Sequence, residues 1–136
     1  IIACVSPIGI FFGRIANFIN GELVGKISDV PWSVVFNKID LLPRHPSQLY
    51  EAFLEGIVLF LIINLTILRK NYVIGTCSYQ FLILYGIFRI ICELFREPDI
   101  QVGYLFNLIS VGTLLSFCMI FVGIILSIFL RKKNEI

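Results

Sequence analysis

Residues 104–130 read YLFNLISVGTLLSFCMIFVGIILSIFL, without one charged side chain. A helix needs about 20 largely apolar residues to cross the hydrocarbon core of a bilayer, so this stretch predicts a transmembrane helix. The stretch is longer than a perpendicular crossing requires, and we expect the helix to be tilted. Only 15% of the whole chain is charged, against about 25% in soluble domains, and the mean hydropathy is +0.94. The sequence therefore predicts an all-α integral membrane protein.

Composition also narrows the range of cofactors and partners. The four cysteines are scattered through apolar segments without C-x-x-C spacing: Cys4, Cys77, Cys92 and Cys118. Cysteines in such surroundings behave as small hydrophobic residues, so we expect no metal site, and no motif calls for a cofactor. Basic residues interleaved with aromatic ones would indicate nucleic-acid binding, and the sequence has no such stripe. The expected partner is the membrane itself.

Three further apolar stretches predict the remaining helices of a single membrane domain, residues 1–136. Residues 52–68 and 72–95 are each long enough for a crossing, and residues 1–12 form a partial one. Prolines break long helices, and several of them fall in the polar segment 13–47: Pro31, Pro43 and Pro46. This segment predicts loops and short interfacial helices, with Trp32 at the level of the lipid headgroups.

Positive charges predict the orientation. Short loops on the cytoplasmic side are rich in Lys and Arg, and such residues flank the predicted helices at one face: Arg69, Lys70, Arg131, Lys132 and Lys133. We therefore place this face, with the tail 131–136, in the cytoplasm. Residues 13–50, which include the polar segment 13–47, and residues 89–99 then lie on the extracytoplasmic face.

Arg89, Glu93 and Arg96 stand at positions i, i+4 and i+7 and share one face of a predicted helix. Ionisable side chains within a membrane helix cost roughly 2.5–3.5 kcal/mol each on insertion scales, so they face a cavity or a partner. Two interpretations fit. One is an ion pair that locks two helices together; the other is an anion site, because the guanidinium fork matches phosphate oxygens. Pro98 and Asp99 mark a tight connection into the last helix.

Residues 44–51 read RHPSQLYE and lead into a predicted helix. Ser47 is placed to cap the helix that begins after Pro46. One stripe of that helix then carries three polar side chains, Gln48, Glu51 and Glu55. His45, the only histidine, is either a loop residue bonded to the backbone or a proton carrier. No nucleophile, base and orienting acid form an obvious triad.

Residues 13–25 read GRIANFINGELVG, and three glycines allow close approach of the backbone. Arg14, Asn17 and Asn20 stand at i, i+3 and i+6, so one helical face would offer a cation and two amides. Glu22 is placed to hold an arginine. An interfacial linker without a function would not need this density of amides, so we interpret the segment as a site for a lipid headgroup.

These three segments resemble the prolipoprotein diacylglyceryl transferases, which are bacterial inner-membrane enzymes. Residues 13–25 satisfy every fixed position of the family pattern G-R-x-[GA]-N-F-[hydrophobic]-N-x-E-x-x-G, and residues 45–51 and 89–99 also match. The resemblance is to the carboxy-terminal portion of the family. Relatives have seven spans, and their amino-terminal half supplies a tyrosine and a histidine without counterpart here. Because the chain opens inside an apolar run without Met, we expect it to lack that half.

The resemblance implies transfer of the diacylglyceryl group of phosphatidylglycerol to the lipobox cysteine thiol of a prolipoprotein. Glycerol 1-phosphate would leave, and no metal or cofactor is implied. The implied catalytic residues are Arg14, which would grip the phosphate, and Arg89, oriented by Glu93. The implied substrate-binding residues are Arg14, Asn17, Asn20, Glu22, Gly25, His45, Glu51 and Arg96.

Two other functions remain open. A catalytically inactive membrane fragment or split subunit of the same enzyme would keep the helices and lack the activity. A small-solute transporter would carry charges near the middle of its helices, along a pathway. In this sequence the ionisable residues cluster at one face, which favours headgroup chemistry at the membrane surface.

Overall fold

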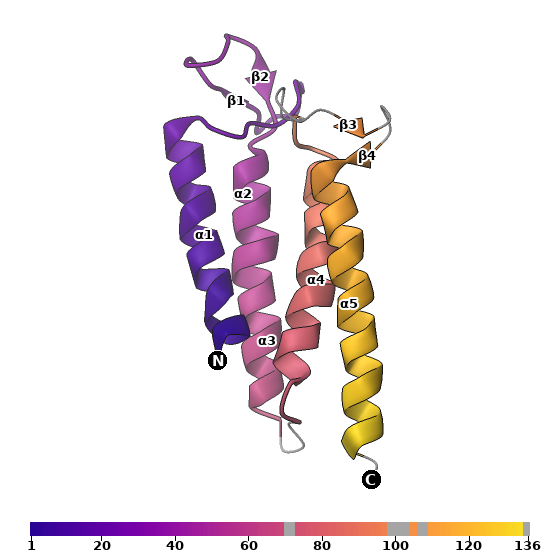
Figure 1. Cartoon of the computed structure of the whole chain (residues 1–136). Helices are drawn as coiled ribbons and strands as arrows, with labels where there is room; N and C mark the ends of the chain where they lie inside the picture. Colours follow the sequence, from indigo (N-terminus) through magenta and orange to yellow (C-terminus); the bar gives the residue numbers. More distant parts are fainter. Residues whose placement is uncertain (70–72, 98–103, 106–108, 135–136) are drawn as a thin grey trace.

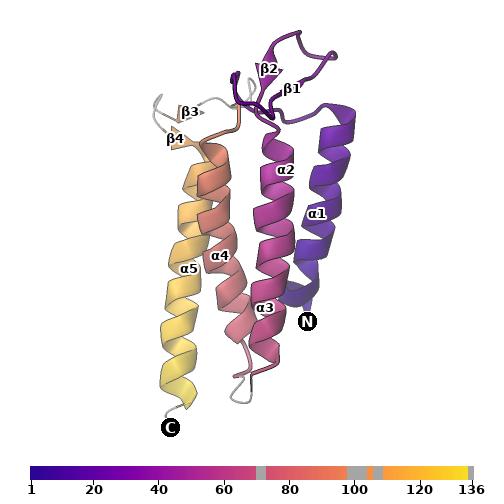
Figure 2. The same cartoon turned by 180° about the vertical axis from the view of Figure 1, so that it is seen from behind.

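The computed structural model describes residues 1–69, 73–97, 104–105 and 109–134. Long helices lie side by side, and short strands gather at one end, which we call the loop end (Figure 1 and Figure 2). Both chain ends lie toward the opposite end of the bundle. The elements in chain order are α1 (Ile2–Asn20), β1 (Val34–Val35), β2 (Pro43–Arg44), α2 (Ser47–Glu51), η1 (Ala52–Val58), α3 (Leu59–Ile67), α4 (Thr76–Glu93), β3 (Tyr104–Leu105), β4 (Ile109–Ser110) and α5 (Val111–Asn134).

Three helices among the described residues are long and apolar enough to cross a membrane: Ile2–Asn20, Ser47–Ile67 and Val111–Leu130. This confirms the predicted class, an all-α integral membrane protein. The helix α4, predicted as a crossing over residues 72–95, begins at Thr76 and does not reach the same apolarity. Its two ends are polar, since Gln80 lies near its start and Arg89 and Glu93 lie near its end.

The first helix is longer than predicted. We expected a partial crossing over residues 1–12, followed by loops and short helices, but α1 continues to Asn20. Pro7 lies in its first turns, and no other proline precedes Gly21, so nothing interrupts the helix. The helix ends where Gly21 adopts a left-handed conformation with φ 70° and the Glu22 N–H donates to the Asn17 carbonyl. Residues 21–46 form the predicted loop, without the predicted short helices.

The second helix is continuous from Ser47 to Ile67 through α2, η1 and α3 (Figure 1). Pro46 stands just before it, where the missing N–H of proline costs nothing. Ser47 does not cap this helix, contrary to the prediction. Its hydroxyl instead donates to the Leu23 carbonyl at 3.2 Å, because the preceding loop folds back over the first turn. The middle segment η1 is π-helical, a form that is rare and frequent at functional sites.

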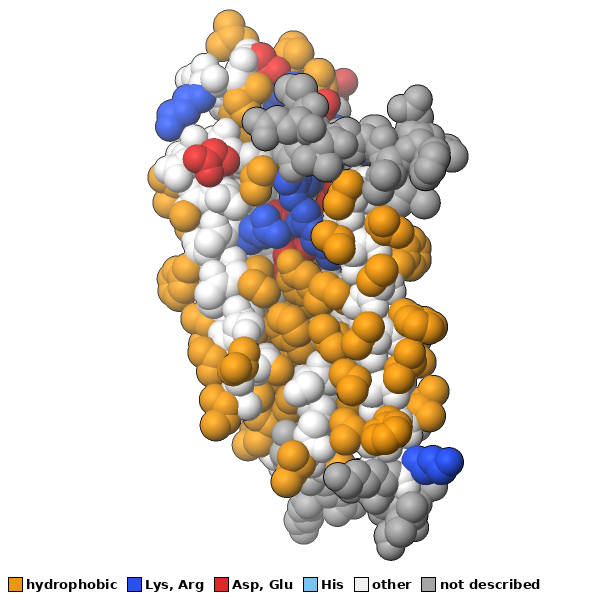
Figure 3. Space-filling view, viewed as in Figure 1, with side chains coloured by type: hydrophobic (Ala, Val, Ile, Leu, Met, Phe, Trp, Pro, Cys, Tyr) orange, Lys and Arg blue, Asp and Glu red, His pale blue; other side chains and the backbone are white. Residues whose placement is uncertain are grey.

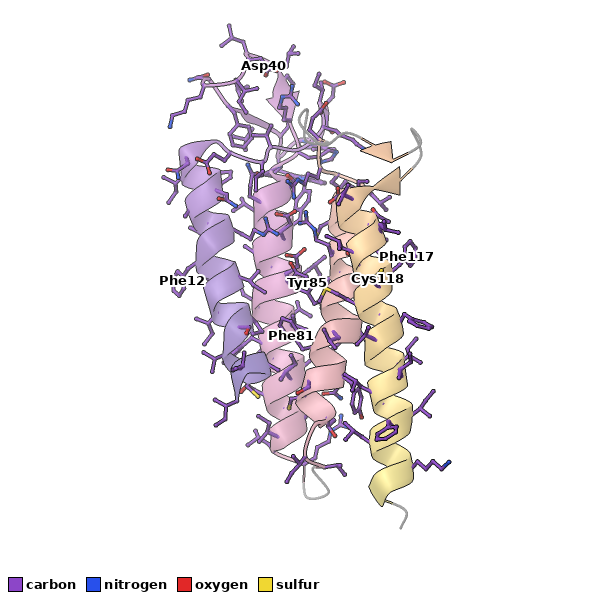
Figure 4. All side chains as sticks on the ribbon, in the orientation of Figure 1. Phe12, Asp40, Phe81, Tyr85, Phe117 and Cys118 are labelled. Carbon is purple, nitrogen blue, oxygen red and sulfur yellow. The ribbon has the colours of Figure 1, made fainter. Side chains whose placement is uncertain are left out.

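Aromatic side chains lie both on the outer surface of the bundle and in its interior. Phe12 and Phe117 point away from the helices, whereas Phe81 and Tyr85 point between them (Figure 4). The buried residues Leu59, Ile63 and Cys77 form the core. Packing of the partly buried Phe81 and Tyr85 against this core continues the interior toward the loop end.

Glycines set the close approach of α4 and α5. A Cβ on Gly86 would lie 2.7 Å from Ile120 Cγ1 and 2.9 Å from the Ser116 carbonyl oxygen, and one on Gly123 would lie 2.7 Å from Ile83 Cγ1. Small residues at such positions let helix backbones approach closely, and this packing favours helix association within a membrane.

The last helix begins later than predicted. We expected a crossing over residues 104–130, but Tyr104 and Leu105 pair as β3 with β4, and α5 starts at Val111. The Ser110 hydroxyl accepts a hydrogen bond from the Thr113 N–H at 3.1 Å, which is an N-cap and explains the start. The predicted tail begins inside the helix, since α5 continues to Asn134. The predicted connection at Pro98 and Asp99 lies outside the described residues.

A small sheet covers the loop end. Residues 24–28 lie between β2 and residues 95–97, through the bridges Ile27–Arg44 and Gly25–Arg96. The strand β1 pairs with the other edge of β2, with Val34 opposite Arg44. We call residues 24–28, β1, β2 and residues 95–97 the cap. The cap joins the loop after α1, the loop before α2 and the end of α4, so it fixes these three helices relative to one another.

Candidate functional site

Ionisable side chains from three helices and the cap meet inside the bundle, just below the loop end. We call this group the arginine–glutamate cluster; its members are Arg14, Glu51, Glu55, Arg89, Glu93 and Arg96. The helix α1 supplies one cation, α2 and η1 supply two anions, and α4 supplies an ion pair. Charges within a membrane protein face one another or a cavity because lipid cannot solvate them.

Arg14 points from α1 toward the second helix. Its Nη1 lies 3.0 Å from Glu51 Oε2, and its Nη2 lies 3.3 Å from Glu55 Oε2. Both carboxylates are fully buried, whereas the Arg14 side chain remains 15% exposed. One guanidinium fork thus spans two acids on successive turns.

Arg89 approaches the same two acids from α4. Its Nη1 donates to Glu51 Oε1 at 2.5 Å and lies 3.6 Å from Glu55 Oε1. Its Nη2 lies 3.3 Å from Glu93 Oε2, so the predicted i, i+4 pair is present. The Arg89 side chain is 11% exposed.

Glu51 is the centre of the cluster. Its carboxylate contacts Arg14 and Arg89, and its Oε1 also lies 3.8 Å from Arg96 Nη1. The three arginines therefore surround one buried acid. Removal of one partner from a buried ion pair costs far more than the pair contributes, because the other charge is left uncompensated.

The cluster balances three cations against three anions, and its members differ in exposure. Glu51 and Glu55 are fully buried, so the exposed parts of the pairs that they form belong to Arg14 and Arg89, whereas Glu93, which pairs with Arg89, is itself 15% exposed. Figure 3 shows arginine or lysine atoms gathered in a recess below the loop end, with acidic atoms behind and beside them. A ligand entering this recess meets guanidinium N–H donors, the groups that bind phosphate oxygens.

The predicted face of Arg14, Asn17 and Asn20 does not act as one unit. Arg14 enters the cluster, Asn17 is partly buried, and Asn20 is exposed at the end of α1. The Asn20 carbonyl accepts a hydrogen bond from Lys38 Nζ at 3.2 Å. Glu22 is exposed and does not hold Arg14, contrary to the prediction, because Glu51 and Glu55 take that place.

Gly25 lies where three backbone segments of the cap cross. Its N–H donates to the His45 carbonyl at 3.2 Å, and a Cβ would lie 2.8 Å from the Phe95 carbonyl oxygen and still closer to His45. Only glycine fits. Nearby, Leu23 has φ 53°, and two side chains from α2 hold this strained segment. They are Ser47, which donates to the Leu23 carbonyl, and Gln48, which donates to the Glu22 carbonyl at 2.7 Å.

His45 lies in an aromatic pocket rather than in the cluster. Trp32 Nε1 donates to the Tyr50 hydroxyl at 2.7 Å, and this hydroxyl lies 3.1 Å from His45 Nδ1. Because the tryptophan N–H can only donate, the Tyr50 oxygen accepts it, and the direction of the bond between the Tyr50 hydroxyl and His45 Nδ1 is set by the tautomer of the ring. Phe95 packs edge-on against the His45 ring.

The pocket has a volume of about 440 Å³ and lies between the second helix and α4. Its lining includes Leu49, Tyr50, Phe53, Ile91 and Phe95. The acids Glu51 and Glu55 and the cation Arg89 come from the same two helices and belong to the cluster. The two helices thus present one set of side chains to the cluster and another to an apolar pocket.

Sequence reasoning missed two residues of this region. Tyr50 orders the His45 ring, and Arg44 joins three segments of the cap. The Asp40–Arg44 pair has i, i+4 spacing and His45 lies close to Tyr50 in the chain, but their other partners, Trp32, Gly25 and Glu97, are distant, and spacing does not report them. In the part of the chain that the structure describes, no three His, Cys, Asp or Glu side chains are grouped as metal ligands.

Comparisons with known proteins agree with the sequence patterns. A family model described as prolipoprotein diacylglyceryl transferase matches residues 1–129. The chain is similar to proteins named phosphatidylglycerol–prolipoprotein diacylglyceryl transferase from Rickettsia bellii strain OSU 85-389, with 52% identity over 130 residues, and from Rickettsia akari strain Hartford, with 51% identity over 126. These matches cover 94% and 90% of this chain. They cover 49% and 48% of the relatives, so the chain spans about half the length of the curated relatives it matches.

Proposed function

The chain belongs to the prolipoprotein diacylglyceryl transferase family, and from this membership we propose that the protein acts in the first step of bacterial lipoprotein maturation. The reaction is transfer of the diacylglyceryl group of phosphatidylglycerol to the lipobox cysteine thiol of a prolipoprotein. The observation that carries the proposal is the recess in which Arg14 and Arg89 are the exposed partners of the buried acids Glu51 and Glu55.

The chemistry requires that negative charge be held on a phosphate. The cysteine thiolate sulfur attacks the terminal glyceryl carbon, a C–S bond forms, and the C–O bond to the phosphate breaks. The electron pair stays on the phosphate oxygen, and glycerol 1-phosphate leaves. Preorganised donors aimed at developing charge are usually the largest contribution to such catalysis, and each charge-assisted hydrogen bond contributes about 1.5–3 kcal/mol.

We assign roles to the cluster on this basis. Arg14 and Arg89 hold the phosphate, Glu93 orients Arg89, and Arg96 adds a third cation. Glu51 holds all three arginines in place before the lipid binds.

The residues around the cluster complete the proposed substrate site. Asn17 and Asn20 are proposed to bind headgroup hydroxyls near the end of α1, with Glu22 in the same segment. Gly25 permits the close packing of the cap over the site. His45 is proposed to order the aromatic pocket through its contacts with Tyr50 and Phe95.

The protein is a multi-pass membrane protein, and we place it in the bacterial inner membrane with the loop end outside. The described basic residues Arg69 and Lys132 are exposed at the opposite end, which supports a cytoplasmic position for that end. The prolipoprotein would present its lipobox from the extracytoplasmic side.

The site also bears on the competing functions. A transporter would need charges near the middle of the helices. Glu51, Arg89 and Glu93 lie in the turns nearest the loop end, and Glu55 lies deeper, in η1. A catalytically inactive fragment or split subunit would have the same cluster, so activity itself must decide.

The test is reconstitution of the protein expressed from its complete gene. Purified protein is mixed with phosphatidylglycerol and a lipobox peptide, and mass spectrometry follows the peptide. The proposal expects a diacylglyceryl adduct on cysteine and an equal amount of glycerol 1-phosphate. A peptide with serine in place of cysteine is the control. Absence of the adduct under conditions in which a relative is active would favour the inactive alternative.

A further inference from the structure

Arg44 has no role in the proposed reaction, although it lies at the centre of the cap. It is 8% exposed, and its guanidinium contacts three segments. Its Nη2 donates to Asp40 Oδ2 at 2.7 Å, and its Nη1 donates both to the Gly25 carbonyl at 3.1 Å and to Glu97 Oε2 at 3.1 Å. Asp40 belongs to the same loop as Arg44, whereas Gly25 and Glu97 belong to other segments, so this cation fixes where those two segments lie.

Two of these contacts lie on paired backbone segments. The Lys26 N–H donates to the Phe95 carbonyl at 2.9 Å, and the Glu97 N–H donates to the Val24 carbonyl at 3.1 Å. Gly25 and Arg96 therefore face each other across an antiparallel bridge. Arg44 donates to the carbonyl of Gly25, which is one residue of the bridge. It also donates to the side chain of Glu97, which follows Arg96, the other residue of the bridge.

Side chains alternate between the two faces of an extended segment. Glu97 is held by Arg44 at one face of the cap, so its neighbour Arg96 is directed to the other face. There the Arg96 guanidinium lies 3.8 Å from Glu51 in the cluster. A slip of one residue would exchange the faces and turn Arg96 away from the cluster.

We propose that Arg44 is a positioning residue that acts through Glu97 and Gly25 to direct Arg96 into the arginine–glutamate cluster. The expected effect of Arg44 on the reaction rate rests on the proposed function. Its expected effect on the position of Arg96 rests on the cap geometry alone. The Glu97 side chain is 48% exposed, and exposed ion pairs add little to stability. The Arg44–Glu97 pair therefore acts on register more than on the unfolding temperature.

The kinetic test compares variants of the protein expressed from its complete gene. Arg44→Gln and Glu97→Gln should each lower kcat/KM for phosphatidylglycerol about tenfold, and the double variant should be no worse than Arg44→Gln. Arg44→Lys should be intermediate, because an ammonium cannot contact all three partners at once. Lys38→Gln removes another cation of the same loop and should leave kcat/KM unchanged.

The decisive comparison uses an Arg96→Gln background. If Arg44 acts through Arg96, Arg44→Gln should cause no further loss there, whereas a merely structural residue would lower activity in both backgrounds. An equal tenfold loss with and without Arg96, or no loss in either background, would overturn the proposal.

A second measurement does not depend on transferase activity. Hydrogen exchange at the Lys26 and Glu97 amides should be faster in Arg44→Gln and Glu97→Gln, and unchanged in Lys38→Gln. Unchanged exchange in Arg44→Gln would refute the positioning role, even if the wild-type protein transfers normally. A wild-type protein that transfers nothing would refute the proposed function and leave this exchange comparison as the test of Arg44.

Discussion

A single buried acid organises the cluster at the scale of residues. Glu51 is fully buried and contacts three arginines from different parts of the chain. Its position in the RHPSQLYE segment made it a predicted substrate-binding residue. The contacts support a positioning role, in which Glu51 holds the arginines and the arginines are the groups proposed to bind the lipid. Sequence spacing predicted the Arg89–Glu93 pair because both lie on one helix, but no spacing links Arg14 to residues 51 and 55.

Glu51→Gln should destabilise the protein markedly. The amide keeps the shape of the side chain but removes the charge that three guanidinium groups share, and breaking a buried pair costs roughly 3 kcal/mol or more. Thermal unfolding in detergent measures the change. Glu22→Gln, at an exposed acid of the neighbouring loop, is the matched control. Equal unfolding temperatures for the two variants would show that the cluster does not depend on Glu51.

Asp40 should make the cap sensitive to acid. The hydrogen bond from Arg44 holds the pKa of the Asp40 carboxyl below its ordinary value. A carboxyl with a lowered pKa stabilises the folded state at pH values above its unfolded pKa of about 3.9. That stabilisation is lost as pH falls through the folded pKa.

The measurement is the unfolding temperature between pH 6 and pH 3, in the wild type and in Asp40→Asn. The wild type should lose more stability on acidification than the variant, since the variant has no carboxyl to protonate there. Parallel pH curves would contradict a stabilising Asp40–Arg44 pair.

At the scale of elements, hydropathy predicted where helices lie better than where they begin and end. Hydropathy bounded the second crossing at residues 52–68, and Pro46 rather than hydropathy predicted the start of the helix, which includes Ser47 to Glu51. The first helix passes through Gly13 because a single helical glycine is tolerated, and Gly21 ends it. The start of α5 at Val111 depends on the Ser110 cap and on pairing of β3 with β4, neither of which hydropathy reports.

Gly86→Ala should weaken the packing of α4 against α5. The added Cβ would lie 2.7 Å from Ile120 Cγ1 and 2.9 Å from a backbone oxygen, so the helices must separate. Overpacking of this kind costs typically 1–3 kcal/mol. Gly9→Ala is the control, because no heavy atom lies within 4 Å of its Cβ position. Thermal unfolding of both variants tests the prediction, which fails if Gly86→Ala is as stable as Gly9→Ala.

At the scale of the whole molecule, the two ends of the bundle differ. The loop end carries the cap and the cluster, and the other end carries exposed Arg69 and Lys132. The sequence predicted this division from charge alone. It did not predict the recess, because Arg14, Glu51 and Arg89 come together only when three helices pack.

The proposed orientation in the membrane rests on this division. Lys38→Cys, at the loop end, should react with an impermeant maleimide added outside intact spheroplasts. Lys132→Cys, at the other end, should react only after permeabilisation. Both parent residues are exposed, so accessibility of the thiol does not differ between them. Labelling of residue 132 from outside would reverse the proposed topology.

The central claim is that guanidinium groups in the recess hold the phosphate of phosphatidylglycerol, and diacylglyceryl transfer by Arg14→Ala tests it most directly. We compare the initial rate of thioether formation in wild type, Arg14→Ala and Arg69→Ala, all expressed from the complete gene and inserted to the same level. Arg14→Ala should be slower by about a hundredfold or more, because the loss of charge-assisted bonds of about 1.5–3 kcal/mol each has this effect on a rate. Arg69→Ala, at the far end, should be unchanged. A wild-type rate for Arg14→Ala would contradict the account.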